Sequence, residues 1–487
     1  MSAQRAGGSG IGFRSERGPV LIGIMLSTAL VAIDATIIAT AVPSIVRTLG
    51  GFAQFPWLFS VYLLAQAVTV PVYGKLADVF GRKPVMLFGI GLFLLGSVLC
   101  GAAWSMGALI AFRAVQGLGA GAVQPMAMTI VGDLYSLEER AKVQGYIASV
   151  WGVSSVVGPT LGGVFSEYVS WRWIFFVNVP LCLIAAATIG LRFAERVERR
   201  RPRIDYAGAG VLTVALTLVI LGVLEGGQSW AWNSPQSVAV LGGGALLLGL
   251  FVLIERRAAD PVVPLRLLRR RLLVATNVVA ACVGAILLGL TSYVPTFVQD
   301  VLGTGPLVAG FALAALTLGW PLSGSQSGRL YLRVGFRVTA TVGAAVVVLG
   351  TAALLLLDGS SSVFQVGLTS FVIGLGMGFA AAPTLIAAQS AVEWRERGVV
   401  TGLNMFFRSA GSAIGVAVFG AIANATLGRS GIEGGRVPPE ALTTAVHHVF
   451  LATTLLSLAM LVAVRLMPRD RYRAPAPAAA APEVAAG

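Results

Sequence analysis

The segment GKLADVFGRK (Gly74–Lys83) returns in altered form as GRLYLRVGFR (Gly328–Arg337) later in the chain. Glycine occupies the first and eighth positions of both segments, and a basic residue occupies the second and the tenth. A second pair, QGLGAGAVQP (Gln116–Pro125) and IGLGMGFAAA (Ile373–Ala382), recurs at nearly the same spacing. Because self-similarity at a fixed spacing is the signature of a repeated architecture, the chain is predicted to contain two related halves.

These segments lie between long apolar runs in a chain of unusual composition. Of the 487 residues, 56% are hydrophobic and only 11% are charged. A soluble globular chain carries about 25% charged residues, so this chain has too few polar residues to cover a surface in water. Its glycines and prolines follow no collagen-like period, and it has no long polar tract. These observations exclude the soluble, fibrous and disordered classes, and the lipid bilayer is the expected solvent.

A helix that crosses a bilayer needs about 20 mostly apolar residues, and the chain contains fourteen such runs. They cover residues 19–41, 54–74, 84–104, 107–131, 143–166, 173–191, 206–225, 236–255, 273–297, 306–326, 338–357, 363–390, 398–424 and 442–466. The first run has no small-residue cleavage site and contains Asp34, so we expect a retained helix and not a signal peptide. Continuous runs also exclude an outer-membrane barrel, whose strands alternate over about ten residues. The predicted fold class is an all-α polytopic membrane protein.

The repeated segments divide the fourteen runs into two blocks of six, with runs 7 and 8 inserted between them. The expected division is a cytoplasmic N-terminal tail over 1–18, a six-helix bundle over 19–191, the inserted pair with basic flanking loops over 192–272, a second six-helix bundle over 273–467, and a disordered cytoplasmic tail over 468–487. Two repeated six-helix halves are typical of transporters, in which the halves rock around a site near the bilayer midplane.

The net charge of +14 is explained by topology. If the N-terminus is cytoplasmic, 29 of the 35 Lys and Arg residues fall in cytoplasmic loops and tails. Four fall outside, and two, Arg113 and Arg408, lie within apolar runs. Because cytoplasmic loops carry the excess of Lys and Arg, this asymmetry places both termini in the cytoplasm. The basic charge therefore does not indicate nucleic acid as a partner.

Two charged residues lie deep in the first half, Asp34 in the first run and Arg113 in the fourth. A carboxylate at the bilayer centre costs about 2.5–3.5 kcal/mol, so Asp34 should face the bundle interior. Burial favours the protonated carboxyl and a nearby cation favours the charged one, so a group between the two influences can load and release a proton. Arg113 cannot deprotonate and would act electrostatically. The alternatives are a carboxyl that only supports helix packing and an arginine that snorkels to the interface.

The loop GKLADVFGRK has the features of a conformational latch. Gly74 and Gly81 permit close helix ends and a positive φ, and Asp78 can accept from the N-terminus of another helix. We expect Arg82 and Lys83 to face the inner surface, where the loop would close the cytoplasmic side in one state. A topology signal also explains the basic residues, and the two interpretations are compatible.

The fifth run contains GVSSVVGPTLGG, which places Gly152, Gly158, Pro159, Gly162 and Gly163 in one helix. Proline within a helix frees a carbonyl and bends the axis, and the glycines offer a smooth contact face. We expect a bent helix between the two halves that serves in gating. A bend needed only for packing is the alternative.

Other polar residues give weaker indications. Glu225 and Asp300 lie near the outer ends of their runs. One interpretation is that they contact cations at the outer mouth of the cavity, and the other is that they are only solvated at the membrane interface. Arg408 lies within the thirteenth run as a further candidate for the cavity. No metal is expected, because His447 and His448 have no third ligand nearby.

Together these segments resemble the major facilitator superfamily, and within it the fourteen-helix drug:proton antiporter branch. GKLADVFGRK is similar to the signature loop of the superfamily. FRAVQGLGAG and GVSSVVGPTLGG resemble the motifs that accompany antiporters, and IDATIIATAVP and WRWIFFVNVP resemble segments of the fourteen-helix branch. The resemblance implies that Asp34 couples protons or substrate and that Arg113 promotes proton release. It also implies an inner latch over Gly74–Lys83 and an antiport-type bend at Gly158 and Pro159.

We therefore expect proton-coupled efflux of lipophilic small molecules across a bacterial cytoplasmic membrane by alternating access. The alternative is a dedicated exporter of one endogenous metabolite, antibiotic or lipid. We expect no enzyme activity and no cofactor, a proton gradient as the energy source, and a monomer. Two departures from the family pattern bear on substrates. Leu332 stands where the second-half loop would carry an acid, and no acid lies deep in runs 9–14, so dicationic substrates are not expected.

Overall fold

The computed structural model describes residues 12–13, 15–50, 57–195, 205–226, 230–258, 261–427 and 439–468. Within these residues it contains no β-sheet, and fourteen helical segments are long and apolar enough to cross a membrane. The prediction of an all-α polytopic fold is confirmed. Most of the predicted N-terminal tail, and all of the predicted C-terminal tail except residue 468, lie outside the described residues.

The first half of the chain comprises seven helices in the described residues, because the sixth apolar run forms two of them. They are α1 (Gly18–Leu49), α2 (Trp57–Phe80), α3 (Arg82–Gly101), α4 (Met106–Leu134), α5 (Leu137–Val164), α6 (Trp173–Phe176) and α7 (Asn178–Arg192). The inserted pair is α8 (Tyr206–Glu225) and α9 (Pro235–Glu255). The second half comprises α10 (Arg271–Thr296), α11 (Pro306–Val334), α12 (Phe336–Leu354), α13 (Val363–Ser390), α14 (Arg397–Leu427) and α15 (Pro439–Arg465).

Several helices extend beyond the apolar runs that predict them. Helix α1 continues to Leu49, and α5 begins at Leu137, several residues before its apolar run. The early start of α5 has a local cause, since Ser136 accepts from the backbone N–H of Glu139 while the Glu139 carboxylate accepts from that of Ser136. This capping box fixes the first turn of a helix. Apolar patterning locates the part of a helix that lies in hydrocarbon, whereas caps set where the helix begins.

The same pairs of helices pack against one another in both halves. Helix α4 packs on α2 and α3, as α13 packs on α11 and α12, and α1 packs on α5 and α7, as α10 packs on α14 and α15. Glycines allow close approach at equivalent places. A Cβ on Gly119 of α4 would lie 2.4 Å from the backbone nitrogen of Phe93, and one on Gly343 of α12 would lie 2.6 Å from that of Ala380. Small residues give such contacts in membranes because apolar side chains gain little over lipid.

The repeated loops also share a backbone feature. Gly81 separates α2 from α3 with φ 100°, and Gly335 separates α11 from α12 with φ 88°. Glycine adopts this region without the steric cost that a Cβ brings. The eighth-position glycine of each repeated segment therefore allows an abrupt reversal between two membrane helices.

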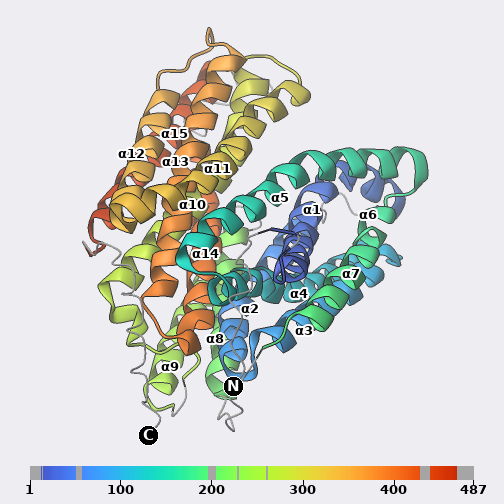
Figure 1. Cartoon of the computed structure of the whole chain (residues 1–487). Helices are drawn as coiled ribbons and strands as arrows, with labels where there is room; N and C mark the ends of the chain where they lie inside the picture. Colours follow the sequence, from blue (N-terminus) through green and yellow to red (C-terminus); the bar gives the residue numbers. More distant parts are fainter. Residues whose placement is uncertain are drawn as a thin grey trace, which may run out of the picture.

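The two halves contact each other through α2 with α14 and through α5 with α11. We call the end of the bundle that carries the loop Gly74–Lys83 the basic end. The α5–α11 contact lies toward this end, because Gly145 faces Ser325 and Gly152 faces Pro321. Figure 1 shows that the far end of α5 and the start of α11 lie apart at the opposite end.

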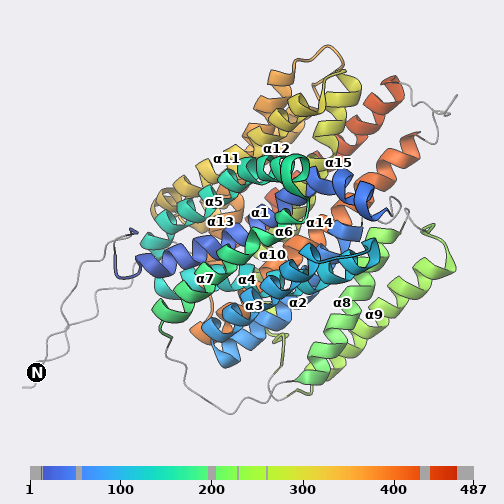
Figure 2. The same cartoon turned by 90° about the vertical axis from the view of Figure 1, so that its right-hand side faces the viewer.

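The inserted helices lie along one flank of the molecule in both views (Figures 1 and 2). Helix α8 packs on α9, on α2 and on α14. Its buried Leu212 and Leu216 belong to one apolar cluster with Leu64 and Val68 of α2 and Leu403 of α14. The inserted pair therefore covers the seam between the two halves on this flank.

Candidate functional site

Asp34 and Arg113 form an ion pair inside the first half. Nη1 of Arg113 lies 2.7 Å from Oδ2 of Asp34, and each residue is only 1% exposed. The guanidinium also donates to the side-chain oxygen of Gln116 at 2.7 Å and to the carbonyl oxygen of Leu58 at 3.1 Å. Its carbon lies 4.1 Å from the centre of the Tyr62 ring. The structure thus brings together α1, α2 and α4 around one buried charge pair.

Gln116 completes the polar network around the carboxylate. Its amide nitrogen donates to Oδ1 of Asp34 at 2.8 Å and to the hydroxyl of Ser97 at 2.9 Å. Ser97 in turn accepts from the amide of Asn178 on α7 at 3.4 Å. Both carboxylate oxygens therefore have partners, as a buried charge requires. Protonation of Asp34 would remove the attraction to Arg113, so this pair can convert a proton into a change of contacts between α1 and α4.

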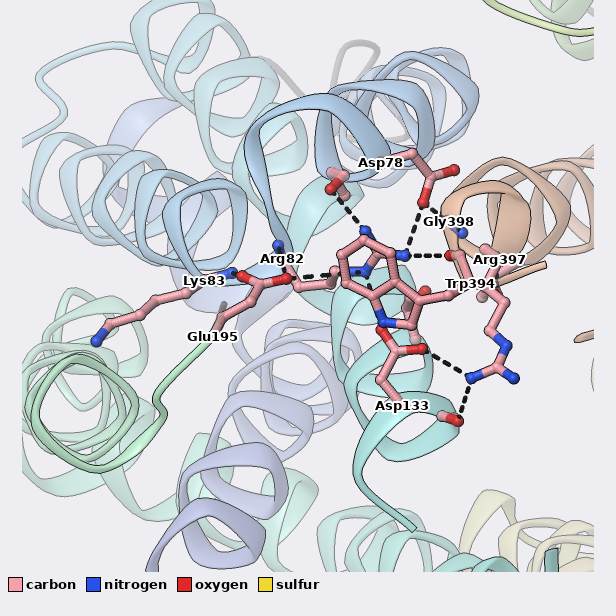
Figure 3. Close-up of polar contacts among 12 residues, drawn as sticks. Asp78, Arg82, Lys83, Asp133, Glu195, Trp394, Arg397 and Gly398 are labelled. Carbon is pink, nitrogen blue, oxygen red and sulfur yellow. Dashed lines mark hydrogen bonds and ion pairs between the residues drawn. The ribbon is translucent and has the colours of Figure 1, made fainter. Parts of the chain in front are cut away.

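A second polar cluster lies at the basic end and joins the two halves (Figure 3). Asp78, near the end of α2, accepts from the backbone N–H groups of Gly398 and Val399 at 3.0 and 2.8 Å. These are the free N–H groups of the first turn of α14, where the helix dipole favours negative charge. A carboxylate of the first half therefore caps a helix of the second half.

Arg82 holds this cluster together from the middle. It lies 2.9 Å from the carboxylates of both Asp78 and Asp133, and it donates to the carbonyl oxygen of Trp394 at 2.7 Å. Its guanidinium carbon lies 3.7 Å from the centre of the Trp394 ring. The expectation that Arg82 faces the inner surface is wrong, because the residue is fully buried. The buried guanidinium therefore has two carboxylates and an aromatic ring as partners, and it lies where the two halves meet.

Further residues extend the cluster on both sides. Glu195 accepts from the backbone N–H groups of Arg82 and Lys83 at 2.9 and 3.0 Å. Arg397 of α14 donates to Asp133 of α4 at 3.1 Å. Gly74 permits the closest approach, since a Cβ there would lie 2.6 Å from the carbonyl oxygen of Gly398. The segment predicted to form a latch thus meets the second half directly, and Lys83 contributes its backbone.

The second repeated loop makes one crossing contact of its own. The hydroxyl of Tyr331, on α11, donates to the carbonyl oxygen of Leu137 at 3.0 Å. Leu332, which stands at the acid's position in the repeat, packs in the small apolar cluster around Tyr331. The hydrogen bonds and ion pairs named above that join the two six-helix halves, together with those from Gln389 to Met128 and from Arg397 to Gly132, lie toward the basic end.

The glycines of α5 do not all lie where the sequence interpretation puts them. A Cβ on Gly158 would lie 2.0 Å from Oγ1 of Thr36, and one on Gly162 would lie 2.2 Å from Oγ1 of Thr40. Both glycines therefore pack on α1 within the first half and not between the halves. Gly152 faces Pro321 of the second half, and Gly163 has open space. The side chain of Pro159 lies outside the described residues.

The weaker candidates lie apart from both clusters. Glu225 ends α8 and is buried, so it does not line an open mouth. Asp300 is exposed in a π-helical turn, Phe297–Val301. Arg408 lies partly exposed within α14. No group of residues in the described part of the chain is suited to hold a metal ion.

The residues that the sequence interpretation missed are Asp133, Glu195, Trp394 and Arg397. A signal was present for Arg397, because Glu396-Arg397 repeats the pair Glu139-Arg140 of the first half. Asp133 and Glu195 stand where charges are ordinary, near the ends of apolar runs, and only the packing of distant helices distinguishes them.

A comparison with protein families decides the identity of this fold. The sequence profile of the Major Facilitator Superfamily matches residues 24–416. The chain belongs to this superfamily. The protein is accordingly a multi-pass membrane transporter, and the resemblance seen in the sequence motifs is confirmed.

Relatives within the superfamily include efflux proteins. Multidrug resistance protein 3 of Bacillus subtilis is 35% identical over 405 residues, 83% of this chain and 79% of the relative. The multidrug transporter protein MdtP of the same organism is 33% identical over 419 residues, 86% of this chain and 77% of the relative. The efflux pump dotC of Dothistroma septosporum is 31% identical over 404 residues, 81% of this chain and 69% of the relative.

A solved member of the superfamily has the same overall arrangement. The crystal structure of the human organic anion transporter MFSD10 matches with a TM-score of 0.64 and covers 92% of this chain and 99% of its own. At 16% identity the likeness supports the fold alone.

Proposed function

We propose that the protein exports lipophilic small molecules from the cytoplasm in exchange for protons, by alternating access between its two halves. The observation that carries this proposal is the buried pair of Asp34 and Arg113 in a superfamily transporter whose relatives include multidrug efflux proteins. A carboxylate that has an arginine partner and no exposed surface suits a proton site better than a site for bulky cations.

The sidedness of the proposal rests on charge. The basic end carries most of the Lys and Arg residues, and such loops remain in the cytoplasm. On this assignment the halves are joined at the cytoplasmic end, by Asp78, Arg82 and Arg397, and lie apart at the outer end. The described conformation then corresponds to the outward-facing state of the cycle.

The coupling step follows from the contacts of Asp34. A proton that enters from outside neutralises the carboxylate and removes its attraction for Arg113. The guanidinium retains Gln116 and the carbonyl oxygen of Leu58 as acceptors. The interaction that protonation weakens is therefore the ion pair that joins α1 to α4. A shift of α1 would reach α5 through Thr36, which donates to the carbonyl oxygen of Ser154 at 3.1 Å. Helix α5 in turn contacts the second half, and its movement would loosen the basic end.

The gradient supplies the energy for export. Each charge that moves across the membrane contributes about 2.3 kcal/mol per 100 mV. Uptake of a proton from outside can therefore drive release of a substrate against its own gradient.

The test uses purified protein in liposomes with an imposed pH gradient and a pH-sensitive dye in the lumen. Addition of a lipophilic substrate should dissipate the gradient with the wild-type protein and should not with Asp34→Asn. Asp358→Asn is the matched control, because Asp358 is an exposed acid in the turn between α12 and α13. Substrate transport that leaves the gradient intact would contradict proton exchange.

A resistance profile separates the two forms of export that the sequence leaves open. Cells that express the protein should tolerate several unrelated lipophilic compounds. Protection against a single compound would favour a dedicated exporter of one metabolite, antibiotic or lipid.

A further inference from the structure

Arg408 is a cation at the depth of the hydrocarbon core. Its guanidinium has no partner among the described residues. It makes no side-chain hydrogen bond or ion pair there, and it is partly exposed. It stands 11 residues after Arg397, the first residue of α14, which places it about 16 Å along the helix at 1.5 Å per residue. The hydrocarbon core is about 30 Å thick, so Arg408 lies near mid-membrane. A charge at this depth typically faces the bundle interior or a water-filled cavity and marks a functional site.

The neighbours of α14 show which way Arg408 points. Seven residues earlier, and therefore on the same helix face, Thr401 accepts from the amide of Gln389 at 2.9 Å. That amide also donates to the carbonyl oxygen of Met128, on α4 of the first half, at 3.4 Å. At the basic end, the face that carries Arg408 thus contacts Gln389 of α13, and Gln389 in turn reaches the first half.

The glycines of α14 define the two sides of this face. Gly411 and Gly415 pack on α10, against Ala281 and Ala285, and Gly402 packs on α2, against Val70. At about 100° per residue, position 408 lies about 20° from Gly415, on the side toward Gly402. Arg408 therefore lies on the part of α14 between the side that packs on α10 and the side that packs on α2, and its backbone carbonyl lies against Gly284 of α10.

The facing wall of the first half is polar and uncharged at this depth. Gln66 of α2 and Gln124 of α4 are both partly exposed, and the amide nitrogen of Gln66 lies 3.1 Å from the side-chain oxygen of Gln124. Because α2 and α14 run antiparallel, with Gly74 against Gly398 and Val70 against Gly402, Gln66 lies within about one turn of the depth of Arg408. Beside it Leu63 is 47% exposed. The wall opposite Arg408 thus offers amide donors and acceptors together with an apolar surface.

No described acid neutralises this cation. Asp34 is the acid within the membrane-spanning part of the first half, and it is 1% exposed and already paired with Arg113. Asp78 and Asp133 lie at the basic end, where Arg82 and Arg397 hold them. Among the described residues, no acid therefore compensates the positive charge of Arg408 at mid-membrane.

We infer that Arg408 binds the oxyanion of an amphiphilic substrate, a small molecule with one carboxylate, sulfonate or phosphate on an apolar body. A guanidinium presents parallel N–H donors that match an oxyanion, and the pairing is strong where water is scarce. The apolar body of the substrate would pack against apolar side chains such as Leu63. This inference rests on the proposed export function and names its substrate class.

The test uses two fluorescent probes that share an apolar body. They are 1-anilinonaphthalene-8-sulfonate, which carries the oxyanion, and N-phenyl-1-naphthylamine, which does not. Transport of both is measured in phosphatidylcholine liposomes for the wild type, Arg408→Gln and Arg408→Lys. Arg47→Gln is the matched control, because Arg47 is an exposed arginine at the end of α1.

The expected result is a rise of about tenfold or more in the KM of Arg408→Gln for the sulfonate, with the KM for the neutral probe unchanged. Arg408→Lys should lie between the wild type and Arg408→Gln, since an ammonium keeps the charge and loses the paired donors. Retained transport of the neutral probe shows that the variants fold. An unchanged KM of Arg408→Gln for the sulfonate would overturn the inference.

Further outcomes distinguish this inference from the export proposal and from the binding of a lipid headgroup. If the wild type transports neither probe, and no lipophilic substrate causes it to move protons, the export proposal fails. If the wild type transports both probes and Arg408→Gln has the wild-type KM for the sulfonate, only the inference about Arg408 fails. Added phosphatidylglycerol should leave sulfonate transport unchanged. Competition by this lipid in the wild type and not in Arg408→Gln would show a lipid headgroup at the site and overturn the assignment to a small molecule.

Discussion

Arg113 makes directed contacts that a lysine cannot reproduce. Its guanidinium donates to Asp34, Gln116 and the carbonyl oxygen of Leu58 at once, whereas an ammonium is a point charge on a flexible stem. We expect Arg113→Lys to lower the rate of proton-coupled transport roughly tenfold to a hundredfold, because a hydrogen bond to a charged group contributes about 1.5–3 kcal/mol. Substrate-induced collapse of a pH gradient in liposomes measures this. Transport at the wild-type rate would contradict the role given to the guanidinium.

Gly74 is a position where one methyl group decides whether two helices can meet. An alanine Cβ would lie 2.6 Å from the carbonyl oxygen of Gly398, and that atom belongs to the backbone of α14. We expect Gly74→Ala to prevent full closure of the basic end and to lower transport at least severalfold. Gly91→Ala is the matched control, because nothing lies within 4 Å of its Cβ position. Equal transport rates for the two variants would show that the close approach is not required.

At the scale of the element, the contact between Asp78 and α14 joins two helices through one charge. The carboxylate accepts from Gly398 and Val399 and pairs with Arg82. Asp78→Asn keeps the size of the side chain and removes its charge, so we expect the closed basic end to lose about 1.5–3 kcal/mol relative to the open one.

Labelling of an introduced cysteine measures that change. Gly145→Cys places a thiol at the seam, where Gly145 faces Ser325, and the three native cysteines are buried. A maleimide reagent should react faster with this thiol when Asp78→Asn is also present, and Asp358→Asn should leave the rate unchanged. A rate that is the same in both backgrounds would show that Asp78 does not hold the end closed.

The elements also show how much of the structure can be predicted from the sequence. Fourteen apolar runs and their repeated loops are enough to predict the helices, because each run must satisfy its own backbone in lipid. Asp34 and Arg113 are recognisable since a charge within an apolar run is rare. Asp133 and Arg397 are not, because charges are ordinary at helix ends. Their contact joins residues separated by 264 positions, and no local pattern specifies it.

Packing direction is the second property that the sequence leaves open. The glycines of GVSSVVGPTLGG predict a smooth helix face, yet they do not specify its partner. Gly158 and Gly162 meet Thr36 and Thr40 of the same half, and Gly152 meets Pro321 of the other. A period of 3.6 residues fixes which positions share a face, whereas the partner depends on how whole helices are arranged.

At the scale of the whole molecule, transport requires the two halves to separate at the basic end. The seam between α5 and α11 offers a direct test of this movement. A Cβ on Gly145 would lie 3.1 Å from the Cβ of Ser325, and a disulfide needs about 3.5–4.5 Å between its two Cβ atoms. A small outward adjustment of the helices therefore allows Gly145→Cys and Ser325→Cys to be linked.

We expect an oxidant to stop transport by the double variant and a reductant to restore it, because the crosslink holds the halves together at the end that must open. Transport of a neutral lipophilic dye in liposomes, measured before and after each reagent, gives the result. The single variants should be unaffected by the oxidant, since the three native cysteines are buried. If the oxidised double variant is fully crosslinked and still transports at its reduced rate, substrate must pass without separation of α5 from α11. Alternating access around this seam would then be wrong, even though the fold and the family would stand.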